Sequence, residues 1–411
     1  MTGNSKALRQ LLSETKDGDW GKGEPTEGYI PVHVIRGTDF SDVKLGKPAN
    51  VPLRFLSEKT VHRRLLQADD ILIETAGGSR DRPTGRTLLI TQETLDQFPG
   101  PVTCASFARF LRINSRAVNP RYLYWYLQHL YARGDMWVHQ VQHTGVARFQ
   151  FTRFAESEMV PLLHRSEQEG IASLLGMLDD KIAVNERIAT TIAELADAYF
   201  YHAVNQVEFG DETFGSVAVV AGGGTPSTKV EDYWNGEIQW TTPSDVTALS
   251  SPYLFETERT ITDLGLQNCA SQLYPAQSIF MTSRATIGAF ALPQVPAAVN
   301  QGFIVVIPPN DDMRWWLFHE MRSRVDEMIS LANGSTFLEL SRKNFKAMRI
   351  RLPEAADITS FARTVAPLHA AAAQAAKESR TLAALRDTLL PQLMSGRLRV
   401  GDAEKIVEDE T

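Results

Sequence analysis

Two long amphipathic segments limit the possible folds of this chain more than any other feature. In the first, around residues 165–200, apolar side chains recur at alternating steps of four and three residues, which is the heptad spacing of a coiled coil. The predicted seam consists of Ile171, Leu175, Leu178, Ile182, Asn185, Ala189, Ile192, Ala196 and Tyr199. A polar seam residue such as Asn185 can fix the register. Ser166 and Glu169 are predicted to form a capping box at the helix start.

The second segment closes the chain with the same periodicity. Its predicted seam consists of Ile358, Phe361, Val365, Leu368, Ala372, Ala375, Leu382 and Leu389. Pro353 precedes this helix as Pro161 precedes the first, and Pro367 predicts a kink inside it. Each helix alone leaves an apolar seam exposed, so the two are expected to pair as an antiparallel rod. Asp179, Asp180 and Lys181 are expected on a solvated face of that rod.

An internal repeat indicates how the rest of the chain is organised. Segments of the first half recur in the second half in the same order, about 190 to 208 residues later, and short β-branched runs broken by Gly and Pro indicate α+β domains. The matching ranges are 28–40 with 236–246, 68–90 with 275–292, 119–130 with 311–321, and 143–162 with 332–353. The predicted plan is a first domain at 1–160, a central helix at 161–207, a second domain at 208–353, a terminal helix at 354–400 and an acidic tail at 401–411.

Composition and charge exclude several classes of protein. The net charge is −7, but the first helix and the acidic tail carry most of the excess acid, so DNA binding by the remainder is allowed. Cys104 and Cys269 are far apart and have no cysteine neighbours, which argues against a disulfide framework or a zinc site and fits the cytoplasm. No apolar run resembles a signal peptide or approaches the ~18 residues of a membrane helix.

The same segments resemble a known family. The motifs that carry the resemblance are EQEGIASLLGMLDDKIAVN at 167–185, GGGTPSTKVEDYWNGEIQWTTPSDV at 222–246, SRATIGAF…AVNQGFIVV within 283–306, and LRDTLLPQLMSGRLRV at 385–400. They look like the specificity subunit of type I restriction–modification systems. That resemblance implies two α/β target-recognition domains separated by two long helices that form an antiparallel coiled coil. The first domain lacks the family's opening glycine-rich strand and GxTPS turn, and KDGDWGKGEPTEGYIPV takes their place.

Motifs for independent catalysis do not emerge from the sequence. The stretch NPRY at 119–122 approaches the D/N-P-P-Y/F turn of an adenine methyltransferase, but Arg121 replaces the second proline. We interpret it as a helix start, with Asn119 as the cap and Pro120 in the first turn. The glycines at 222–224 lack a dinucleotide-binding continuation, no phosphate-binding P-loop occurs, and the nine histidines show no metal-ligand spacing.

Arginines and small polar residues on glycine-rich loops are the candidates for DNA contact, because base edges are read by such donors and phosphates fix the register. In the first domain the predicted residues are Arg80, Arg82, Arg86, His143, Thr144 and Arg148. The arginine loop at 77–87 could equally be a solvated hairpin tip. In the second domain they are Thr225, Ser227, Lys229, Thr241, Thr242, Ser244, Arg284, Thr286 and Ser335. Asn300 and Gln301 could bind adenine or bond to the backbone, and Trp234 and Trp240 are expected in the core.

The resemblance implies a non-catalytic subunit that reads a bipartite, asymmetric site in double-stranded DNA. It would dock two methyltransferase subunits, which supply S-adenosylmethionine, and restriction subunits that use ATP and Mg²⁺, while binding no cofactor itself. The assembled complex would then be an adenine-specific DNA methyltransferase and type I site-specific deoxyribonuclease. Two other hypotheses about the function stay open at this point. One is a coiled-coil adaptor without DNA specificity, and the other is a nuclease or methyltransferase that acts alone.

Overall fold

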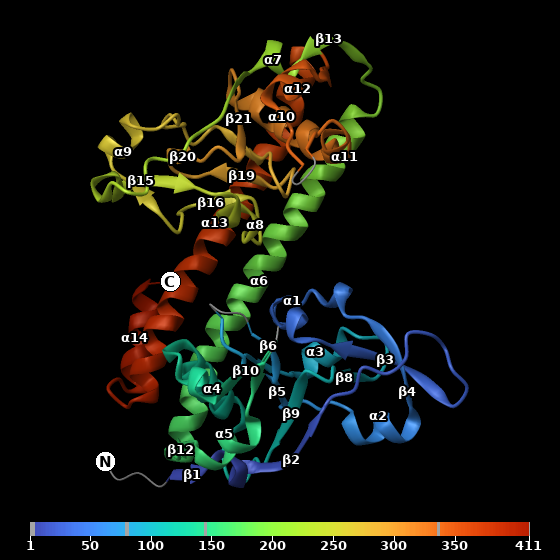
Figure 1. Ribbon diagram of the computed structural model, residues 1–411, viewed down its shortest axis with the longest axis vertical. Coiled ribbons are helices and arrows are strands. Elements are labelled where there is room, and N and C mark those ends of the chain that lie inside the picture. Colours follow the sequence, from blue (N-terminus) through green and yellow to red (C-terminus); the bar gives the residue numbers. More distant parts are fainter. Residues whose placement is uncertain (1–4, 79–81, 144–145, 335–337, 411) are drawn as a thin grey trace. The chain divides into compact units, whose positions relative to one another are not determined.

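The structure is a computed structural model that describes residues 5–78, 82–143, 146–334 and 338–410. It divides into two compact units. Unit 1 comprises residues 1–184 with 379–411, and unit 2 comprises residues 185–378. Each unit contains a mixed α/β domain and a stretch of both long helices (Figure 1). No helix in the described ranges combines the length and apolar content that a membrane crossing requires.

Unit 1 is built on two sheets. The larger is an antiparallel sheet of β2 (Leu12–Asp17), β9 (Ala108–Ile113), β5 (Ile71–Glu74) and β7 (Thr87–Leu89), in that order. The smaller contains β4 (Leu53–Ser57), β3 (Tyr29–Ile35) and β8 (Val102–Cys104), in which β3 and β8 are parallel. The short helices α1 (Phe40–Lys44), α2 (Glu58–Arg64) and α3 (Gln92–Asp96) connect these strands.

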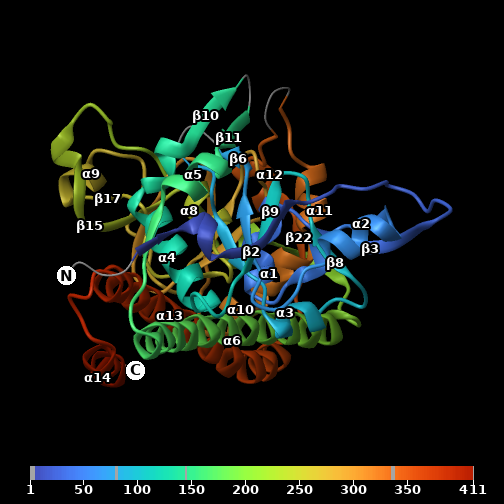
Figure 2. The same cartoon turned by 90° about the horizontal axis from the view of Figure 1, so that it is seen from below.

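The rest of unit 1 surrounds the larger sheet. Helix α4 (Pro120–Arg133) contributes much of the core and begins as predicted, because the Asn119 side chain accepts hydrogen bonds from the first-turn amides and Pro120 follows it. A hairpin of β10 (Gln140–His143) and β11 (Val146–Phe149) pairs with β6 (Ala76–Gly78) and lies on the opposite side of the unit from the long helix (Figure 2). Helix α5 (Phe151–Ser157) follows, and β12 (Met159–Pro161) pairs with β1 (Ser5–Ala7).

Unit 2 repeats this topology. Its larger sheet has the order β14 (Val219–Ala221), β21 (Phe303–Ile307), β18 (Ile279–Thr282), β19 (Phe290–Pro293) and β16 (Tyr253–Leu254). Its smaller sheet has β17 (Thr260–Ile261), β15 (Trp234–Thr241) and β20 (Ala297–Val299), with β15 and β20 parallel. The remaining elements are β13 (Phe209–Thr213) paired with β22 (Arg349–Arg351), α7 (Phe214–Val217), α8 (Pro243–Thr247), α9 (Asp263–Gln267), α10 (Asp311–Ser323), α11 (Val325–Ser330) and α12 (Arg342–Ala347).

The internal repeat predicted from the sequence is therefore confirmed at the level of strand order. The sheet order β2-β9-β5-β7 corresponds to β14-β21-β18-β19, and β4-β3-β8 corresponds to β17-β15-β20. Helices α4 and α10 follow the equivalent strands β9 and β21, and helices α5 and α12 precede the equivalent strands β12 and β22. Corresponding positions in the two units can consequently be identified from the strand registers.

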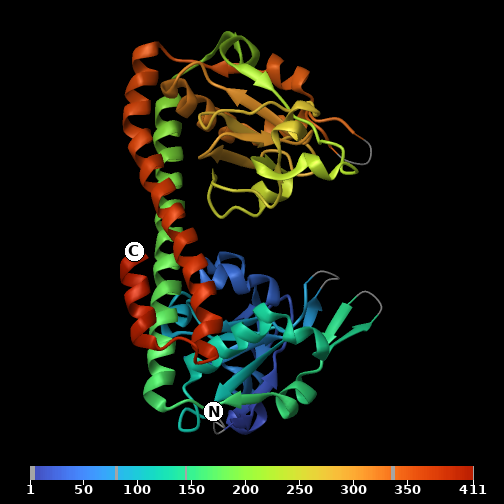
Figure 3. The same ribbon diagram turned by 90° about the vertical axis from the view of Figure 1, so that its left-hand side faces the viewer.

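The long helices α6 (Arg165–Val204) and α13 (Ala355–Met394) pack along the predicted seams (Figure 3). In unit 1, Asp179 of α6 pairs with Arg386 of α13. In unit 2, Asn185 is buried and donates to Glu378 at 3.0 Å. Partner numbers therefore rise along one helix as they fall along the other, which is the antiparallel arrangement that the sequence predicts.

Three local predictions about these helices are wrong, and the kink predicted at Pro367 stays a prediction. Tyr199 is exposed, and Phe200 takes its seam place because it packs on Trp316 of the second domain. The start of α6 is capped by Glu167, whose carboxylate accepts from the His164 amide, instead of by a Ser166–Glu169 box. Helix α13 continues without a break through Pro367. Finally, Asp179 is not solvated but lies in an ion cluster.

That ion cluster fixes the first domain to the helix pair within unit 1. Asp179 is only 12% exposed and binds Lys44 of α1 at 2.7 Å as well as Arg386. The Lys44 ammonium also lies 5.9 Å from the ring centroid of Trp125 in α4. Because Asp179 is largely buried, its carboxylate depends on these two cations, and removing both would leave its charge uncompensated.

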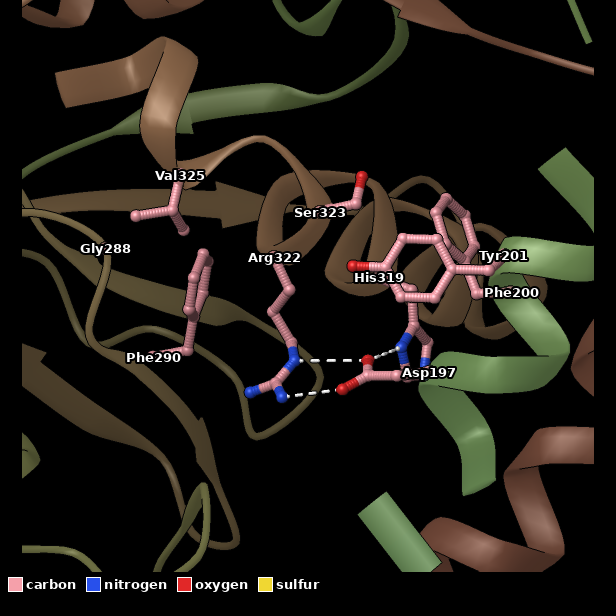
Figure 4. Close-up of a pocket in the computed structure, with 9 residues that line it drawn as sticks. All are labelled: Asp197, Phe200, Tyr201, Gly288, Phe290, His319, Arg322, Ser323 and Val325. Atoms are coloured by element: carbon pink, nitrogen blue, oxygen red, sulfur yellow. Dashed lines mark hydrogen bonds and ion pairs between the residues drawn. The ribbon is translucent and has the colours of Figure 1, made fainter. Parts of the chain in front are cut away.

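A different polar chain fixes the second domain to the helices within unit 2, and Figure 4 shows Asp197, His319 and Arg322 of this chain. Asp197 of α6 accepts from His319 Nδ1 at 2.7 Å, and His319 Nε2 lies 2.9 Å from His369 Nε2 of α13. Tyr253 donates its hydroxyl proton to His369 Nδ1 at 2.8 Å. Every group is satisfied when both imidazoles are neutral and His369 donates to His319. Arg322 completes the chain through its ion pair with Asp197.

Burial and neighbouring charges set the protonation of this chain. Burial, with a smaller contribution from the neighbouring His319, lowers the pKa of His369 to about 2. The pKa of His319 is also lowered by burial, although Asp197 opposes the shift. Burial acts to raise the pKa of Asp197, but hydrogen bonds from His319 and Arg322 outweigh it and hold that pKa at about 2.

The acidic tail belongs to unit 1. Residues 400–410 form helix α14 (Val400–Glu410), and Ala403 on this helix is fully buried. Val400 packs against Gly170 near the start of α6, where an added Cβ would come within 3.1 Å of the valine side chain.

The histidine chain predicts a specific pH dependence of stability. Because the folded-state pKa of His369 lies far below the value of about 6.5 in an unfolded chain, protonation favours unfolding. We expect full stability above about pH 6.5 and a decline as the pH falls towards about 2. His369→Leu should lose about 1–3 kcal/mol at pH 8, because Tyr253 and His319 lose a partner, and should show a shallower decline below pH 6.5. Urea unfolding at pH 8, 6 and 5 measures both effects.

The exposed His202 of α6 supplies the control, since His202→Leu should keep the wild-type pH profile. Equal slopes below pH 6.5 for the wild type and His369→Leu would show that the buried pair does not govern acid stability.

Candidate nucleic-acid interface

Each unit contains a pocket at the same place in its fold. The unit 1 pocket has a volume of about 790 Å³ and the unit 2 pocket about 420 Å³. Three segments border each pocket. They are the end of a central strand (β5 or β18), the turn that connects two consecutive strands of different sheets (β8 to β9 or β20 to β21), and the start of a short helix (α5 or α12). The strand registers show that these bordering segments occupy corresponding positions in the two units.

Backbone hydrogen bonds hold the equivalent segments in the same frame. The amide of Thr75, just after β5, donates to the carbonyl of Phe107 in the β8–β9 turn at 2.8 Å. The amide of Ser283, just after β18, donates to the carbonyl of Gly302 in the β20–β21 turn, also at 2.8 Å. The two pockets therefore share one backbone plan.

A glycine is required at one point of this plan in both units. A Cβ added to Gly223 would lie 1.9 Å from the carbonyl oxygen of Val299, and a Cβ added to Gly18 would lie 1.9 Å from that of Cys104. The next amide, Gly224 or Asp19, donates to the same carbonyl, at 3.1 and 2.9 Å respectively. The atypical opening KDGDWG thus retains the close backbone approach that the glycine-rich run provides in unit 2, although the GxTPS turn is absent from it.

The thiol of Cys104, whose carbonyl lies beside Gly18, is unreactive near neutral pH. Cys104 is fully buried, and burial raises the pKa of its thiol to about 12. It therefore stays protonated near neutral pH and offers no thiolate nucleophile.

The three arginines predicted on the 77–87 loop of unit 1 differ in their surroundings. Arg80 lies outside the described residues. Arg82 is exposed and donates to the carbonyl of Gly77 at 3.3 Å. Arg86 is held inside the unit by two hydrogen bonds to the buried Glu74 and one to the carbonyl of Gly37, and the Glu74 bonds raise its pKa. Neither Arg82 nor Arg86 lines the unit 1 pocket.

The predicted hairpin residues of unit 1 lie nearer the pocket. Arg148 of β11 is exposed and lines it. Thr144 lies outside the described residues, and for His143 the structure describes only the backbone at the end of β10. The hairpin therefore contributes one described cation to the pocket.

The sequence analysis missed several residues of the unit 1 pocket. Arg153 at the start of α5 is exposed and lines it with Arg148. Arg109 of β9 also lines it, but is bound to Asp17 by two hydrogen bonds of 2.7 and 2.8 Å. Phe107 is exposed on the β8–β9 turn. Arg153 lies in the repeat range 143–162 and could have been considered, whereas Phe107 and Arg109 lie outside all the matched ranges.

One of the predicted DNA-contact residues, Arg284, lines the unit 2 pocket, and Thr225 is linked to the pocket through Gln301. Thr225 donates its hydroxyl proton to Gln301 at 2.7 Å, and Gln301 lines the pocket. Arg284 lines it and pairs with Glu339 at 2.8 Å. Arg342 and Lys343, which begin α12, are exposed lining residues that the sequence analysis missed. Neither of these two side chains is hydrogen-bonded to another residue in the described ranges.

The other predicted residues of unit 2 do not line this pocket. Thr242 caps α8 through Asp245, the exposed Ser244 hydroxyl lies 2.8 Å from that of Thr242, and Thr241 is fully buried. Thr286 is exposed on the turn after β18. Ser227 and Lys229 are exposed on the loop that follows the glycines at 222–224. Ser335 lies outside the described residues.

Two structural interpretations from the sequence are confirmed. Asn300 accepts a hydrogen bond from the Gly302 amide at 2.8 Å, so it shapes the turn. Trp234 and Trp240 are buried and pack edge to face, and their indole N–H groups donate to the carbonyls of Ser227 and Gly224.

The chemistry of both pockets suits an anionic, hydrogen-bonding ligand. Exposed guanidinium and ammonium groups complement phosphates, and amide and hydroxyl groups can bond to base edges. Among the described residues, no group of three or more His, Cys, Asp or Glu side chains is placed to hold a metal ion.

Comparison with known proteins agrees with this chemistry. The family described as Type I restriction modification DNA specificity domain matches residues 207–360. The MjaIX specificity subunit of Methanocaldococcus jannaschii is 35% identical over 139 residues, 33% of this chain and 32% of that protein. The EcoR124I/EcoR124II specificity subunit of Escherichia coli is 25% identical over 194 residues, 44% of this chain and 47% of that protein. The chain thus spans about a third to a half of these relatives' length.

A solved structure extends the likeness in fold to nearly the whole chain. The S subunit of a type I restriction–modification system from M. genitalium matches with a TM-score of 0.58 and 15% identity, covering 95% of this chain and 96% of that one. The resemblance predicted from the sequence is confirmed: residues 207–360 match the type I DNA specificity domain, and parts of the chain are similar in sequence to specificity subunits of type I restriction enzymes.

Proposed function

We propose that this chain is the DNA-recognition subunit of a type I restriction–modification complex, in which each unit reads one part of a bipartite, asymmetric site. The observation that carries the proposal is the pair of pockets that share a backbone frame but differ in side chains. The equivalent pairs are Ala76 and Arg284, Ser106 and Gln301, Phe107 and Gly302, Arg148 and Glu339, and Thr152 and Lys343. A common frame favours the same approach to the duplex, and unlike side chains favour different bases.

The charges that border the pockets support a duplex as the ligand. Arg148 and Arg153 in unit 1, and Arg342 and Lys343 in unit 2, are exposed beside hydroxyl and amide groups. Phosphate contacts from such cations position a protein on DNA, and the neighbouring groups supply sequence preference. A coiled-coil adaptor without DNA specificity would have no use for exposed cations in the equivalent pockets of both domains.

The outer face of α6 supports docking of partner subunits. Within unit 1, Met177 and Val184 are exposed seven residues apart, and within unit 2 Ile188 and Leu195 are exposed with the same spacing. A heptad-spaced apolar row on a helix suits contact with helices of another protein. We infer that two methyltransferase subunits dock on the helix pair and supply S-adenosylmethionine for adenine methylation. Restriction subunits using ATP and Mg²⁺ would join the same complex.

The chain alone should transfer no methyl group and cut no DNA, because we assign it recognition and docking only. Purified protein incubated with duplex DNA and labelled S-adenosylmethionine should leave the DNA unlabelled and intact. Addition of the methyltransferase subunits should start labelling. Label transfer by the chain alone would contradict the proposal.

Removing two cations of the unit 2 pocket should weaken duplex binding and its dependence on salt. The double variant Arg342→Ala/Lys343→Ala should bind less tightly, and the slope of log affinity against log salt should fall by about 2 if each cation contacts one phosphate. Fluorescence anisotropy across a salt titration measures both quantities.

The matched control removes two exposed cations from the long helices, Arg187→Ala/Arg363→Ala, and should keep the wild-type slope. A slope unchanged by the pocket variant would remove this pocket from the DNA-binding surface. A wild-type chain with no salt-dependent binding would favour the adaptor function instead.

The helix pair should set the spacer between the two half-sites. A four-residue insertion in both helices, duplicating residues 186–189 in α6 and 374–377 in α13, adds about 6 Å and slightly more than one turn to each. The seam stays nearly in phase as a stutter that a coiled coil can absorb. We expect the same half-sites with a spacer longer by one or two base pairs, at about 3.4 Å each, in methylome sequencing.

Insertion in α6 alone should abolish activity, because the two helices would lose their matched register. An active double-insertion variant that methylates sites with the original spacer would show that the helices do not act as a ruler.

A further inference from the structure

One large apolar side chain of the unit 1 pocket is exposed to water. Phe107 stands on the β8–β9 turn with 58% of its surface exposed, whereas its pocket neighbours Phe149 and Phe151 are buried. Single exposed apolar side chains are common on protein surfaces, but this one borders a pocket that exposed arginines also line, so it is placed to contact a ligand there.

The backbone beneath Phe107 is held firmly. Its carbonyl accepts from the amides of Thr75 at 2.8 Å and Ala76 at 3.3 Å. The turn is closed by the Ala108 amide, which donates to Ala105 at 2.9 Å. Presentation of the ring therefore requires little further ordering when a ligand binds, which favours affinity.

The fold itself does not need this ring. The equivalent residue of unit 2 is Gly302, and the same turn forms there with the same backbone bond from Ser283. Phe107 is therefore an addition to the shared frame, at one of the positions where the two pockets differ.

The surroundings of Phe107 favour a nucleic acid over a protein partner. Arg148 and Arg153 line the same pocket and are exposed, and neither guanidinium bonds to another residue in the described ranges. An aromatic ring flanked by such cations would face base edges while the arginines contact the phosphates. The thymine 5-methyl group is the apolar feature that base edges present in the major groove.

We propose that Phe107 is a specificity-determining residue of unit 1, whose ring packs on the 5-methyl group of a thymine in one half-site. This inference rests on the proposed DNA-reading function. It predicts that unit 1 prefers thymine at one position through an apolar contact, and that unit 2 makes no equivalent contact.

Uracil substitution tests this contact without changing the protein. The target site is first identified by methylome sequencing of a host that carries the chain with its partner subunits. Duplexes are then made in which each thymine of the site is replaced singly by deoxyuridine, which lacks only the methyl group. The complex with its methyltransferase subunits should lose about fourfold in affinity at one thymine of one half-site, the effect of one buried methyl group.

The variant Phe107→Ala should bind the thymine and uracil duplexes equally at that position. Met159→Ala removes another exposed apolar side chain of unit 1, on β12, and should keep the wild-type discrimination. Thermal unfolding should show that both variants fold as the wild type does, since both side chains are largely exposed.

The outcomes separate this inference from the proposed function. Specific binding that is insensitive to uracil at every thymine overturns the methyl contact while leaving DNA recognition intact. A Phe107→Ala complex that weakens equally on all duplexes and bends them less overturns it in favour of a wedge between base steps. A wild-type complex without sequence-specific binding overturns both proposals.

Discussion

The antiparallel seam between α6 and α13 is the contact on which the other features of this chain depend. Its apolar positions bury Leu175 and Leu389 in unit 1 and Ala196 and Val365 in unit 2, so each domain has a helical surface on which to pack. Small alanines let the two backbones approach, and the buried Asn185 opposes slippage because its amide donates to Glu378 at only one alignment. A shift of one turn would separate that pair and the Asp179–Arg386 pair together.

The two domains use different chemistry to attach to the same kind of helix surface. Unit 1 relies on charges, with Lys44 and Arg386 converging on Asp179. Unit 2 relies on a neutral histidine pair between Asp197 and Tyr253. The repeated fold therefore carries two chemically different attachments, and acid conditions should affect the second more than the first.

Much of the fold could be predicted because the heptad spacing and the ordered repeat are properties of the sequence alone. The burial of Phe200 in place of Tyr199 could not be predicted, since the packing of Trp316 decides which of the two aromatic side chains turns inward. The site was only partly predicted. Loop composition identified Arg148 and Arg284, but Arg86 has the same sequence character and is held by Glu74, a partner twelve residues away. Such pairings depend on tertiary contacts that composition does not reveal.

The close approach at Gly18 and Gly223 has a consequence for how such proteins can diversify. Any side chain there would collide with a carbonyl oxygen, so these two positions tolerate almost no drift, while the pocket positions around them are free to vary. A designer could therefore treat the backbone as a fixed socket and exchange only the pocket-lining residues between units. New pairs of half-sites would then arise by transplanting a few side chains, without rebuilding the scaffold that displays them.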